Sequence, residues 1–378
     1  IVTNRHEPVG NPKIKYLGEQ GNYSVATEHQ ELVGVINLPD RQQFVKGAGF
    51  DHLFRNDISE TGRLGWTNVT KSAGIAGNFH GLDAVWWDYN GDHFPDLYIA
   101  NDFTDPDQFL RNNGDGTFTD ISLEALPHTP WFAMGAACAD FNGDGLSDLL
   151  TTDMSATTHY REKISMGAMD AIAWFLDWSV PRQYMRNALY LNSGTERFLE
   201  AAHMSGLASS NWTWSVKAAD LDCDGREDVF FTNGFPRDYN NSDFSEELRR
   251  KGNSSPDAWL NAPELREKNL VFANDGDLHF SEAGDKWGLG EKGISFGAAL
   301  GDLDNDGDLD LVVNHFGQAP SIMRNHTGAG QHRLRVQLVG RNGSNRHGIG
   351  ARVEIELPDG AQQFRELNPG NGFMSADE

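Results

Sequence analysis

The sequence is poor in cysteine, in basic residues and in long apolar stretches. Only two of its 378 residues are cysteine, Cys138 and Cys223, and neither belongs to a CxxC or CxxCH pattern. The sequence therefore indicates neither a disulfide scaffold nor covalent haem attachment. Because no long uninterrupted apolar run occurs, it also predicts no membrane-spanning helix.

Basic residues are outnumbered, since 31 Lys and Arg face 55 Asp and Glu and give a formal net charge of -24. Proteins that bind nucleic acid or an anionic membrane surface need clustered Lys and Arg, so this charge argues against both kinds of partner. The chain begins at Ile1 with no charged-then-apolar leader. We therefore expect that any signal peptide has been removed or that the sequence is a fragment.

The composition is that of a folded protein with many turns. Hydrophobic residues make up 38% of the chain and aromatic residues 11%, which argues against disorder, whereas 41 Gly point to tight turns. A chain of 378 residues also exceeds what one hydrophobic core supports. We therefore expect loop-rich β structure built from domains or from repeats.

An acidic pattern occurs four times along the chain. We name the copies loop 1 to loop 4, and they span residues 88–96, 140–148, 220–228 and 302–310. Each loop has Asp or Asn at positions 1, 3, 5 and 9, counted from its first aspartate. Four copies in one register indicate a repeat architecture rather than a single active site. The sixteen candidate metal ligands are Asp88, Asn90, Asp92, Asp96, Asp140, Asn142, Asp144, Asp148, Asp220, Asp222, Asp224, Asp228, Asp302, Asp304, Asp306 and Asp310.

The segments around the loops repeat as well. A stretch rich in small residues precedes each loop, as in "FGAALG", and two strands follow it, the second of which ends in Asn, as in "ALYLN" and "SIMRN". A further strand comes after a turn, as in "GDGTFTDIS". Each unit therefore reads as about four short strands joined by tight turns, which is typical of a blade of a β-propeller. Blades bury their apolar faces by stacking on their neighbours, so a long chain needs no single large core.

Two of the units contain extra residues. The loops start 52, 80 and 82 residues apart, so the second and third intervals hold insertions, near residues 154–185 and 236–268. The first insertion has helical apolar spacing. The second offers a capping box at Asp243 and Glu246 and a helix start at Pro256. We expect both to form short helices on one rim of the propeller.

The loops favour calcium binding over catalysis and over an EF-hand. Paired carboxylates can act as general acid and base, but an active site needs one such pair and not four copies. An EF-hand needs a Glu at position 12 followed by a helix, whereas these loops hold β-forming residues there. Oxygen ligands at positions 1, 3, 5 and 9, with a backbone carbonyl near position 7, match the shell of about six to eight oxygens that Ca²⁺ prefers. We expect up to four Ca²⁺, one per loop, which would change the formal charge from -24 to -16.

Position 6 of each loop must make a sharp turn. Loops 2, 3 and 4 have Gly145, Gly225 and Gly307 there, whereas loop 1 has His93. His adopts a positive φ more readily than most residues, but we expect loop 1 to be the weakest of the four sites. In loop 4, we expect Asp308 at position 7 to offer its backbone carbonyl and to point its side chain to water.

These motifs resemble two known families. "FGAALGDLDNDGDLDLVVN", taken with "LFRN" and "TFTD", resembles the FG-GAP/VCBS repeats of β-propellers, the class that also builds the integrin α-subunit head. The tail "GSNRHGIGARVEIELPDGAQQFRELNPGNGF" resembles the ASPIC/UnbV domain that follows such repeats in cartilage acidic protein-like bacterial secreted proteins. The resemblance implies a calcium-binding extracytoplasmic β-propeller, and it implies no particular chemistry.

The expected fold is all-β, with a propeller of four-stranded blades, short helical insertions and a small C-terminal β domain. Residues 50–325 would form the propeller, and residues 332–378 an ASPIC/UnbV-like domain that is incomplete, because the family's domain continues with a further β segment. Residues 1–49 lack an aspartate loop, but four β-type stretches there could form a degenerate blade. The family's propellers commonly have seven blades, whereas four units are readable here, so the number of blades stays open.

The favoured function is a non-enzymatic, calcium-stabilised binding or scaffolding module that is secreted, on the cell surface or periplasmic, and that could be a subunit of a larger assembly. Its expected partner is another protein or a surface glycan, with Trp174, Phe175 and Trp178 of the first insertion as candidate contacts. Two alternatives stay open. One is an enzyme that acts on polysaccharide in a cleft on a propeller face, and the other is a lectin-like propeller that binds carbohydrate.

One stretch matches a catalytic pattern. "GISFG", residues 293–297, is a G-x-S-x-G sequence, which is typical of the nucleophile turn of α/β-hydrolases. That turn needs a strand followed by a helix, whereas Ser295 precedes loop 4. We therefore expect no catalytic residue at this place.

Overall fold

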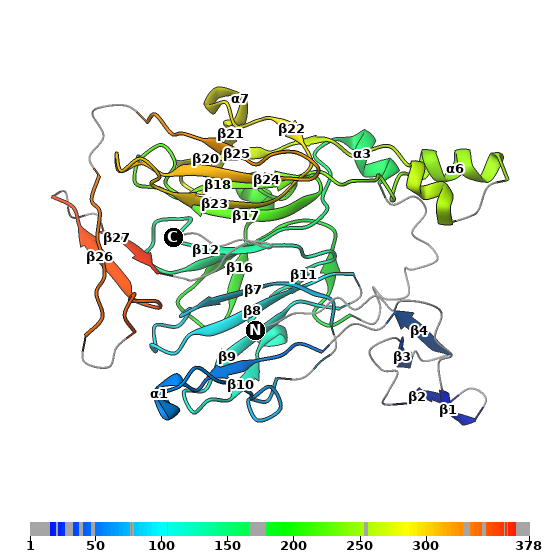
Figure 1. Cartoon of the computed structure of the whole chain (residues 1–378), viewed down its shortest axis with the longest axis horizontal. Helices are drawn as coiled ribbons and strands as arrows, with labels where there is room; N and C mark the ends of the chain where they lie inside the picture. Colours follow the sequence, from blue (N-terminus) through cyan, green and yellow to red (C-terminus); the bar gives the residue numbers. More distant parts are fainter. Residues whose placement is uncertain are drawn as a thin grey trace.

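The computed structural model confirms the all-β prediction. Short antiparallel strands form four successive blades arranged as a β-propeller, and the helices are short (Figure 1). The structure describes residues 16–19, 22–26, 33–37, 41–46, 50–75, 77, 79–103, 105–165, 179–252, 256–327, 333–341, 345–358, 360 and 362–367.

Each blade is an antiparallel sheet whose strands follow one another in the sequence. Blade 1 consists of β7 (Gly81–Trp87), β8 (Asp96–Asn101), β9 (Gln108–Asn112) and β10 (Phe118–Asp120), and blade 2 of β12 (Ala136–Ala139), β13 (Asp148–Thr151), β15 (Ala188–Asn192) and β16 (Phe198–Glu200). Blade 3 consists of β17 (Thr213–Ala219), β18 (Asp228–Asn233), β20 (Leu270–Gly276) and β21 (His279–Glu282), and blade 4 of β23 (Ser295–Gly301), β24 (Asp310–His315) and β25 (Ser321–Met323). Blades 1 to 3 have the predicted four strands, and blade 4 has three among the described residues.

The aspartate loops join the first and second strands of each blade. The last residue of the first strand pairs with the position 9 aspartate that opens the second strand, as Trp87 does with Asp96 and Ala219 with Asp228. Every residue of β8 and β18 is buried, because the sheet is covered on both of its faces. This two-sided burial explains why the second strands read as apolar runs instead of alternating with polar residues.

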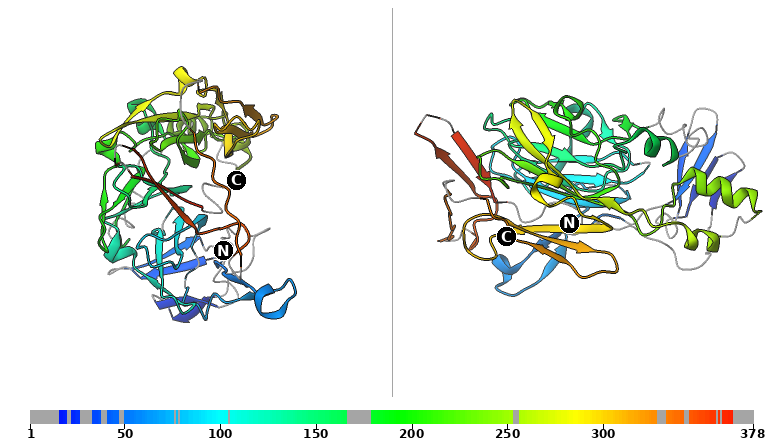
Figure 2. Two further views of the ribbon diagram at one scale, coloured as in Figure 1. Left: turned by 90° about the vertical axis from the view of Figure 1, so that its left-hand side faces the viewer. Right: turned by 90° about the horizontal axis from the view of Figure 1, so that it is seen from above.

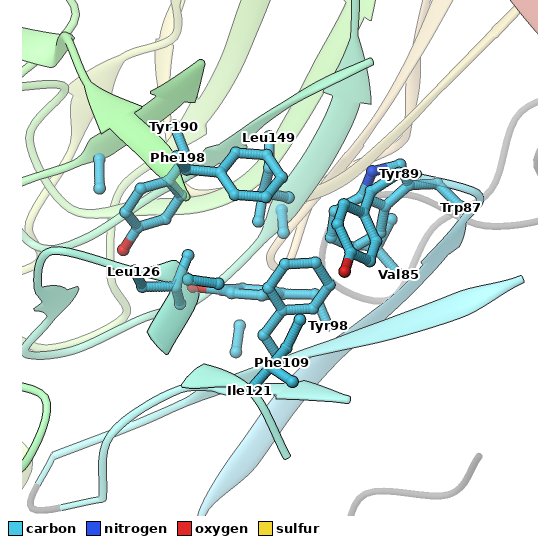
Figure 3. Packing of buried hydrophobic residues seen from close by; sticks show 14 of the residues in the cluster. Val85, Trp87, Tyr89, Tyr98, Phe109, Ile121, Leu126, Leu149, Tyr190 and Phe198 are labelled. Carbon is cyan, nitrogen blue, oxygen red and sulfur yellow. The ribbon is translucent and has the colours of Figure 1, made fainter. Parts of the chain in front are cut away.

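Hydrophobic cores lie between neighbouring blades. Figure 3 shows the core between blades 1 and 2, where Trp87 stacks on Phe109 with ring centroids 5.0 Å apart, and where Leu149 and Tyr190 come from blade 2. Two further clusters of buried side chains separate blade 2 from blade 3 and blade 3 from blade 4. Several small cores therefore stabilise the molecule, as the repeat predicts.

An asparagine at or just after the end of the third strand links blades 2, 3 and 4 to the loop of the blade before each. The Nδ2 of Asn192 in blade 2 donates to the carbonyl of Tyr89 in loop 1 at 2.7 Å, and the Nδ2 of Asn274 in blade 3 donates to Phe141 in loop 2 at 3.0 Å. Asn325 after blade 4 repeats the contact on loop 3 at 2.8 Å. The loops are therefore part of the contact between blades.

The N-terminal stretches form hairpins. Strand β1 pairs with β2, β3 with β4 and β5 with β6, in three two-stranded sheets. Gln42 joins the first two hairpins, because its side chain bonds both the N–H and the carbonyl of Tyr23. Whether residues 1–49 form a degenerate blade stays a prediction. The strands are β1 (Tyr16–Glu19), β2 (Asn22–Val25), β3 (Val33–Asn37), β4 (Gln42–Lys46), β5 (Phe54–Asn56) and β6 (Trp66–Asn68).

The remaining small elements connect the blades. Single-turn helices follow the outermost strands of blades 1 to 3, and another lies between β5 and β6. Two pairs of two-residue strands join neighbouring segments, β11 to β14 and β19 to β22. The helices are α1 (Ile58–Thr61), α2 (Ser122–Ala125), α5 (Ala202–Ser205) and α7 (Gly284–Trp287), and the strands are β11 (Thr129–Pro130), β14 (Gln183–Tyr184), β19 (Glu267–Lys268) and β22 (Lys292–Gly293).

The two insertions carry helices that lie together on one rim (Figure 1). The first contains α3 (His159–Ile164), and the second contains α6 (Ser242–Arg250) and the 3-10 helix η3 (Pro256–Asn261). A partly buried ion pair joins them, in which Arg161 contacts Asp238 at 2.9 Å. Trp174, Phe175 and Trp178 lie outside the described residues.

The helix start at Pro256 is confirmed, whereas the capping box predicted for α6 is wrong. Asn241 caps this helix, because its backbone is extended and its side chain accepts a hydrogen bond from the N–H of Phe244 at 3.1 Å. Asp243 lies inside the first turn, and Glu246 pairs with arginines further along the helix.

The C-terminal residues form a hairpin on the side of the blades that carries the aspartate loops. Strand β26 (Arg352–Glu356) pairs with β27 (Gln362–Glu366). Figure 1 shows this hairpin at one end of the molecule and α3 and α6 at the other. The insertions and the C-terminal hairpin therefore lie at opposite faces of the propeller.

Candidate metal centre

The four loops share one backbone hydrogen-bond pattern. In loop 2, the Oδ1 of Asp140 accepts from the N–H of Asp144 at 3.1 Å, and its Oδ2 accepts from the N–H of Gly145 at 2.9 Å. The same two bonds from positions 5 and 6 to the position 1 carboxylate occur in loops 1, 3 and 4. The position 1 aspartate therefore folds each loop around its own carboxylate.

Two positions of each loop have a positive φ. Position 6 has φ of 69° at His93 and of 87° to 94° at the three glycines, so the sharp turn predicted there is confirmed. Position 4 also has a positive φ, of 59° at Cys223 and 63° at Asn305. The sequence interpretation missed position 4, although the Gly at this position in loops 1 and 2 is a signal for it.

The carboxylates of positions 1, 3 and 5 converge. In loop 3, one oxygen from each of Asp220, Asp222 and Asp224 lies within 4.8 Å of the others, and the equivalent three residues of loop 4 do the same. In loops 1 and 2 position 3 is Asn, and its Nδ2 donates to the position 5 carboxylate at 2.9 Å. The structure thus brings three of the four predicted positions together.

Position 9 lies apart from this group among the described residues. Asp148 is fully buried, its Oδ1 accepts from the N–H of Asn192 at 2.8 Å, and its Oδ2 accepts from the N–H of Phe141 at 3.0 Å. Asp96, Asp228 and Asp310 make the same pair of bonds in their blades. Position 9 therefore joins its loop to the third strand of the same blade.

Burial raises the pKa of the position 9 carboxyl groups of loops 1 to 3. The pKa of Asp148 rises to about 8, and those of Asp96 and Asp228 rise to about 7. Desolvation is the largest cause of the rise in pKa. The neighbouring loop carboxylates raise the pKa further, whereas the backbone N–H donors lower it. Ionising these groups is therefore costly unless a cation is near.

The loop residues fit a hard divalent cation such as Ca²⁺. The side chains at positions 1, 3 and 5 are all carboxylate or amide groups, which can offer an oxygen atom as a metal ligand. Oxygen is the atom type that Ca²⁺ binds. The Oδ1 of Asp222 is buried without a hydrogen-bond partner, so a metal ion would satisfy it. Desolvation and the neighbouring Asp224 and Asp220 raise the pKa of Asp222, as expected for like charges held close together.

Loop 4 is surrounded by arginines. Arg324 pairs with Asp304 and also contacts Asp306, and Arg335 lies 3.6 Å from Asp302. These cations partly neutralise loop 4, so its carboxylates have a protein counter-ion beside the expected metal.

The side chain of Asp308 does not point to water, so this expectation is wrong. The residue is 2% exposed, and its carboxylate pairs with Arg333 at 3.1 Å. Arg333 also donates to the carbonyl of Asp306 at 3.0 Å and to the Sγ of Cys223 at 3.3 Å, so it joins loop 4 to loop 3. A partner distant in the sequence thus buries a residue that the local pattern leaves exposed.

The C-terminal hairpin touches the other three loops. Arg352 donates to the carbonyl of Gly145 in loop 2 at 2.8 Å, Gln363 donates to that of Gly225 in loop 3 at 3.1 Å, and Glu366 accepts from the N–H of Asp88 in loop 1 at 3.2 Å. The segment from Arg333 to β27 therefore contacts all four loops. No sequence pattern predicted these contacts.

Ser295 has a histidine neighbour, but their contact is part of the blade. Its Oγ lies 3.1 Å from the Nδ1 of His315, which is the residue paired with it across β23 and β24. Thr213 and Asn233 make the equivalent contact in blade 3. Both Ser295 and His315 are buried. This arrangement is a cross-strand pair that repeats between blades and not a nucleophile at a surface.

A small pocket lies on the rim that carries the insertions. Its Glu267 accepts from the N–H of Trp212 at 3.1 Å, and burial raises the pKa of this carboxyl group. Cleavage of a glycosidic bond needs two carboxyl groups, and the described lining supplies one. The lining residues are Met154, Ala156, Arg161, Ser165, Asn211, Trp212, Asn240 and Glu267.

Two known families match segments of this chain. The model of the FG-GAP-like repeat matches residues 88–151, 167–231 and 252–313, which together make up half of the chain, and the model of ASPIC and UnbV matches residues 340–378. None of the described helices is long and apolar enough to cross a membrane.

The chain is similar to cartilage acidic protein 1, with 25% identity over 324 residues to the Mus musculus protein and 24% over 326 residues to the Homo sapiens protein. Each alignment covers 84% of this chain but 42% and 41% of these relatives, so the chain spans about two fifths of their length. A solved Agrocybe aegerita lectin, described as recognising non-reducing terminal N-acetylglucosamine, is 16% identical, with 78% of this chain and 66% of that chain covered. Its TM-score of 0.35 is too low to support an argument.

The repeated loops, the blades that contain them and the segments that the family models match all indicate the same family. The chain belongs to the FG-GAP-like repeat family and continues into an ASPIC and UnbV domain.

Proposed function

We propose that this propeller is a calcium-stabilised, non-enzymatic binding or scaffolding module that works outside the cytoplasm, with another protein or a surface glycan as its partner. The observation that carries the proposal is the repetition of one loop geometry in all four blades. A loop geometry that recurs in every blade stabilises the fold, whereas a catalytic group occurs once.

The position of the loops supports a stabilising role for the ion. In loop 2, the carboxylate of Asp148 accepts from the third strand of the same blade. The carbonyls of loops 1 and 2 accept from the asparagines of the following blades. Like charges about 4 Å apart repel by roughly 4 kcal/mol at an effective dielectric near 20. An ion bound among three such carboxylates therefore favours the folded loop over the unfolded chain.

Calcium affinity supports the location outside the cytoplasm. Loops in extracellular modules bind Ca²⁺ with dissociation constants of about 10⁻⁴ to 10⁻³ M. Such sites would be filled where calcium is abundant and empty in the cytosol. Similarity to cartilage acidic protein 1 agrees with this setting.

Thermal unfolding with and without calcium tests the proposal. We expect EGTA to lower the melting temperature and added Ca²⁺ to restore it, because an ion that binds only the folded state stabilises it by on the order of 1 to 3 kcal/mol per site at saturating concentration. The double variant with Asp222→Asn and Asp224→Asn should show a smaller rise in melting temperature when Ca²⁺ is added. The control Asp275→Asn changes an acidic turn outside the loops and should leave that rise intact. A melting temperature that is the same in EGTA and in Ca²⁺ would refute the proposal.

A further inference from the structure

The described residues include four Asn-Gly pairs, and two of them occupy positions 3 and 4 of loops 1 and 2. In such a pair the backbone nitrogen of the glycine can attack the side-chain amide carbon of the asparagine, because glycine has no side chain that hinders the approach. Loops 3 and 4 have aspartate at position 3 and no glycine at position 4. The four pairs are Asn90-Gly91, Asn113-Gly114, Asn142-Gly143 and Asn233-Gly234.

Loops 1 and 2 differ in the hydrogen bonding of this glycine nitrogen. In loop 2, the N–H of Gly143 donates to the Oδ1 of Asp140 at 2.8 Å. In loop 1, the N–H of Gly91 donates no hydrogen bond within the part of the chain that the structure describes, and the position 1 carboxylate accepts from positions 5 and 6. Asn90 is exposed, whereas Asn142 is half-buried. Both the attacking nitrogen and the amide that it would attack are therefore less restrained in loop 1.

The two pairs outside the loops are also restrained. In the turn between β9 and β10, the N–H of Gly114 donates to the Oδ1 of Asn112 at 3.0 Å. Asn233 is fully buried, and its Nδ2 donates to the carbonyl of Lys268 at 2.8 Å. The N–H of the glycine that follows Asn233 is hydrogen-bonded as well. Among the four described pairs, the attacking nitrogen is therefore without a hydrogen bond in loop 1 alone.

We propose that Asn90 is a site of spontaneous deamidation, which gives loop 1 a carboxylate at position 3. Loop 1 lies at the edge of the blades, in the turn between β7 and β8 (Figure 2). The nitrogen of Gly91 bonds to the Cγ of Asn90, the side-chain nitrogen leaves as ammonia, and a cyclic succinimide forms. Water then breaks the bond from this nitrogen to Cγ, which leaves aspartate, or the original peptide bond, which leaves isoaspartate. The reaction consumes water, releases ammonia and needs no oxidant or enzyme.

The two products change loop 1 in different ways. Aspartate reproduces the position 3 carboxylate of loops 3 and 4, which converges there with the carboxylates of positions 1 and 5. Isoaspartate adds a methylene group to the backbone before position 4, so the N–H groups of Asp92 and His93 would move away from Asp88. A stronger calcium site in the aspartate product rests on the proposed function, whereas the reaction itself does not.

Peptide mapping by mass spectrometry, after incubation of the whole chain with EGTA in mildly alkaline buffer, tests the reaction. We expect Asn90 to be deamidated about fivefold faster than Asn142, because no hydrogen bond of the glycine nitrogen has to be broken first. Asn113 and Asn233 are internal controls in the same sample and should also react more slowly. Asn90→Gln should abolish the reaction in loop 1 and leave the other rates unchanged. Equal rates at Asn90 and Asn142, or an unmodified Asn90 after Asn113 has reacted, would overturn the proposal.

Thermal unfolding of the Asn90→Asp chain tests the effect of the aspartate product. We expect added Ca²⁺ to raise its melting temperature by more than it raises that of the unmodified chain, because loop 1 then offers the same carboxylates as loops 3 and 4. An equal rise in the two chains would overturn this effect. If Ca²⁺ raises neither melting temperature, the proposed calcium role fails, and the peptide map still decides whether Asn90 reacts.

Discussion

At the scale of single residues, positions 5 and 9 of a loop differ in what their carboxylates do. Asp148 at position 9 accepts buried N–H groups from Phe141 and Asn192. Asp144 at position 5 is exposed and accepts from Leu146 inside the loop. We expect Asp148→Ala to destabilise the protein by about 3 kcal/mol even in EGTA, because two buried donors lose their partners. Urea unfolding in EGTA measures this loss.

The matched variant Asp144→Ala should behave in the opposite way. In EGTA it should cost less than about 1 kcal/mol, because its partner is near water. In calcium it should remove most of the stabilisation that the ion gives to blade 2. If both variants lose the same stability in EGTA, position 9 has no structural role beyond that of position 5.

Residue types that repeat could be predicted from the sequence, whereas partners distant in the sequence could not. The spacing of the loops predicts the blades, and Gly145 predicts the positive φ at position 6, because both are local properties. The burial of Asp308 depends on Arg333, and the contact of loop 2 with Arg352 depends on a residue about 200 positions away. Only the folded chain brings these residues together.

At the scale of elements, the asparagine after the third strand connects one blade to the next. Asn274 donates to Phe141 of the preceding blade and to Glu227 of its own blade. Asn112 in blade 1 has the same position, but its Nδ2 donates only to Pro95 of its own blade among the described residues. We expect Asn274→Ala to lower the free energy of unfolding by about 1 kcal/mol more than Asn112→Ala does, because it also removes a bond between blades.

Chemical denaturation of both variants, with hydrogen exchange of β18 and β20, checks this difference. Exchange should accelerate at the contact of blades 2 and 3 in Asn274→Ala and should stay slow there in Asn112→Ala. Equal losses of stability in the two variants would show that the asparagine acts only within its own blade. A further element, the C-terminal hairpin, contacts loops 1 to 3, so it is positioned to respond to changes in the loops.

At the scale of the whole molecule, an acidic chain is held together by many small contacts around the loops. The formal charge of -24 disfavours the compact state, and part of that charge lies in carboxylates that the fold buries. Arginines neutralise loop 4, and we propose calcium as the counter-ion of the loops as a group. The stability of the propeller should therefore depend on pH and on calcium together.

The calcium-free protein should lose stability as the pH rises. The pKa of Asp148 is raised to about 8 and those of Asp96, Asp228 and Asp153 to about 7, mainly by burial. Between the ordinary aspartate pKa of 3.8 and these values the folded state holds protons that the unfolded chain has released, so each group destabilises the folded state by roughly 1 kcal/mol per pH unit as the pH rises through that range.

Melting curves in EGTA between pH 5 and about pH 8 should therefore show a melting temperature that falls with pH. Saturating Ca²⁺ should flatten this slope, because a bound cation favours the ionised carboxylates of the loops and leaves buried carboxyl groups outside the loops, such as Asp153 and Asp51, to titrate. Asp153→Asn should reduce that residual slope in calcium. A slope that is equally steep with and without calcium would mean that the loop carboxylates do not bind the ion.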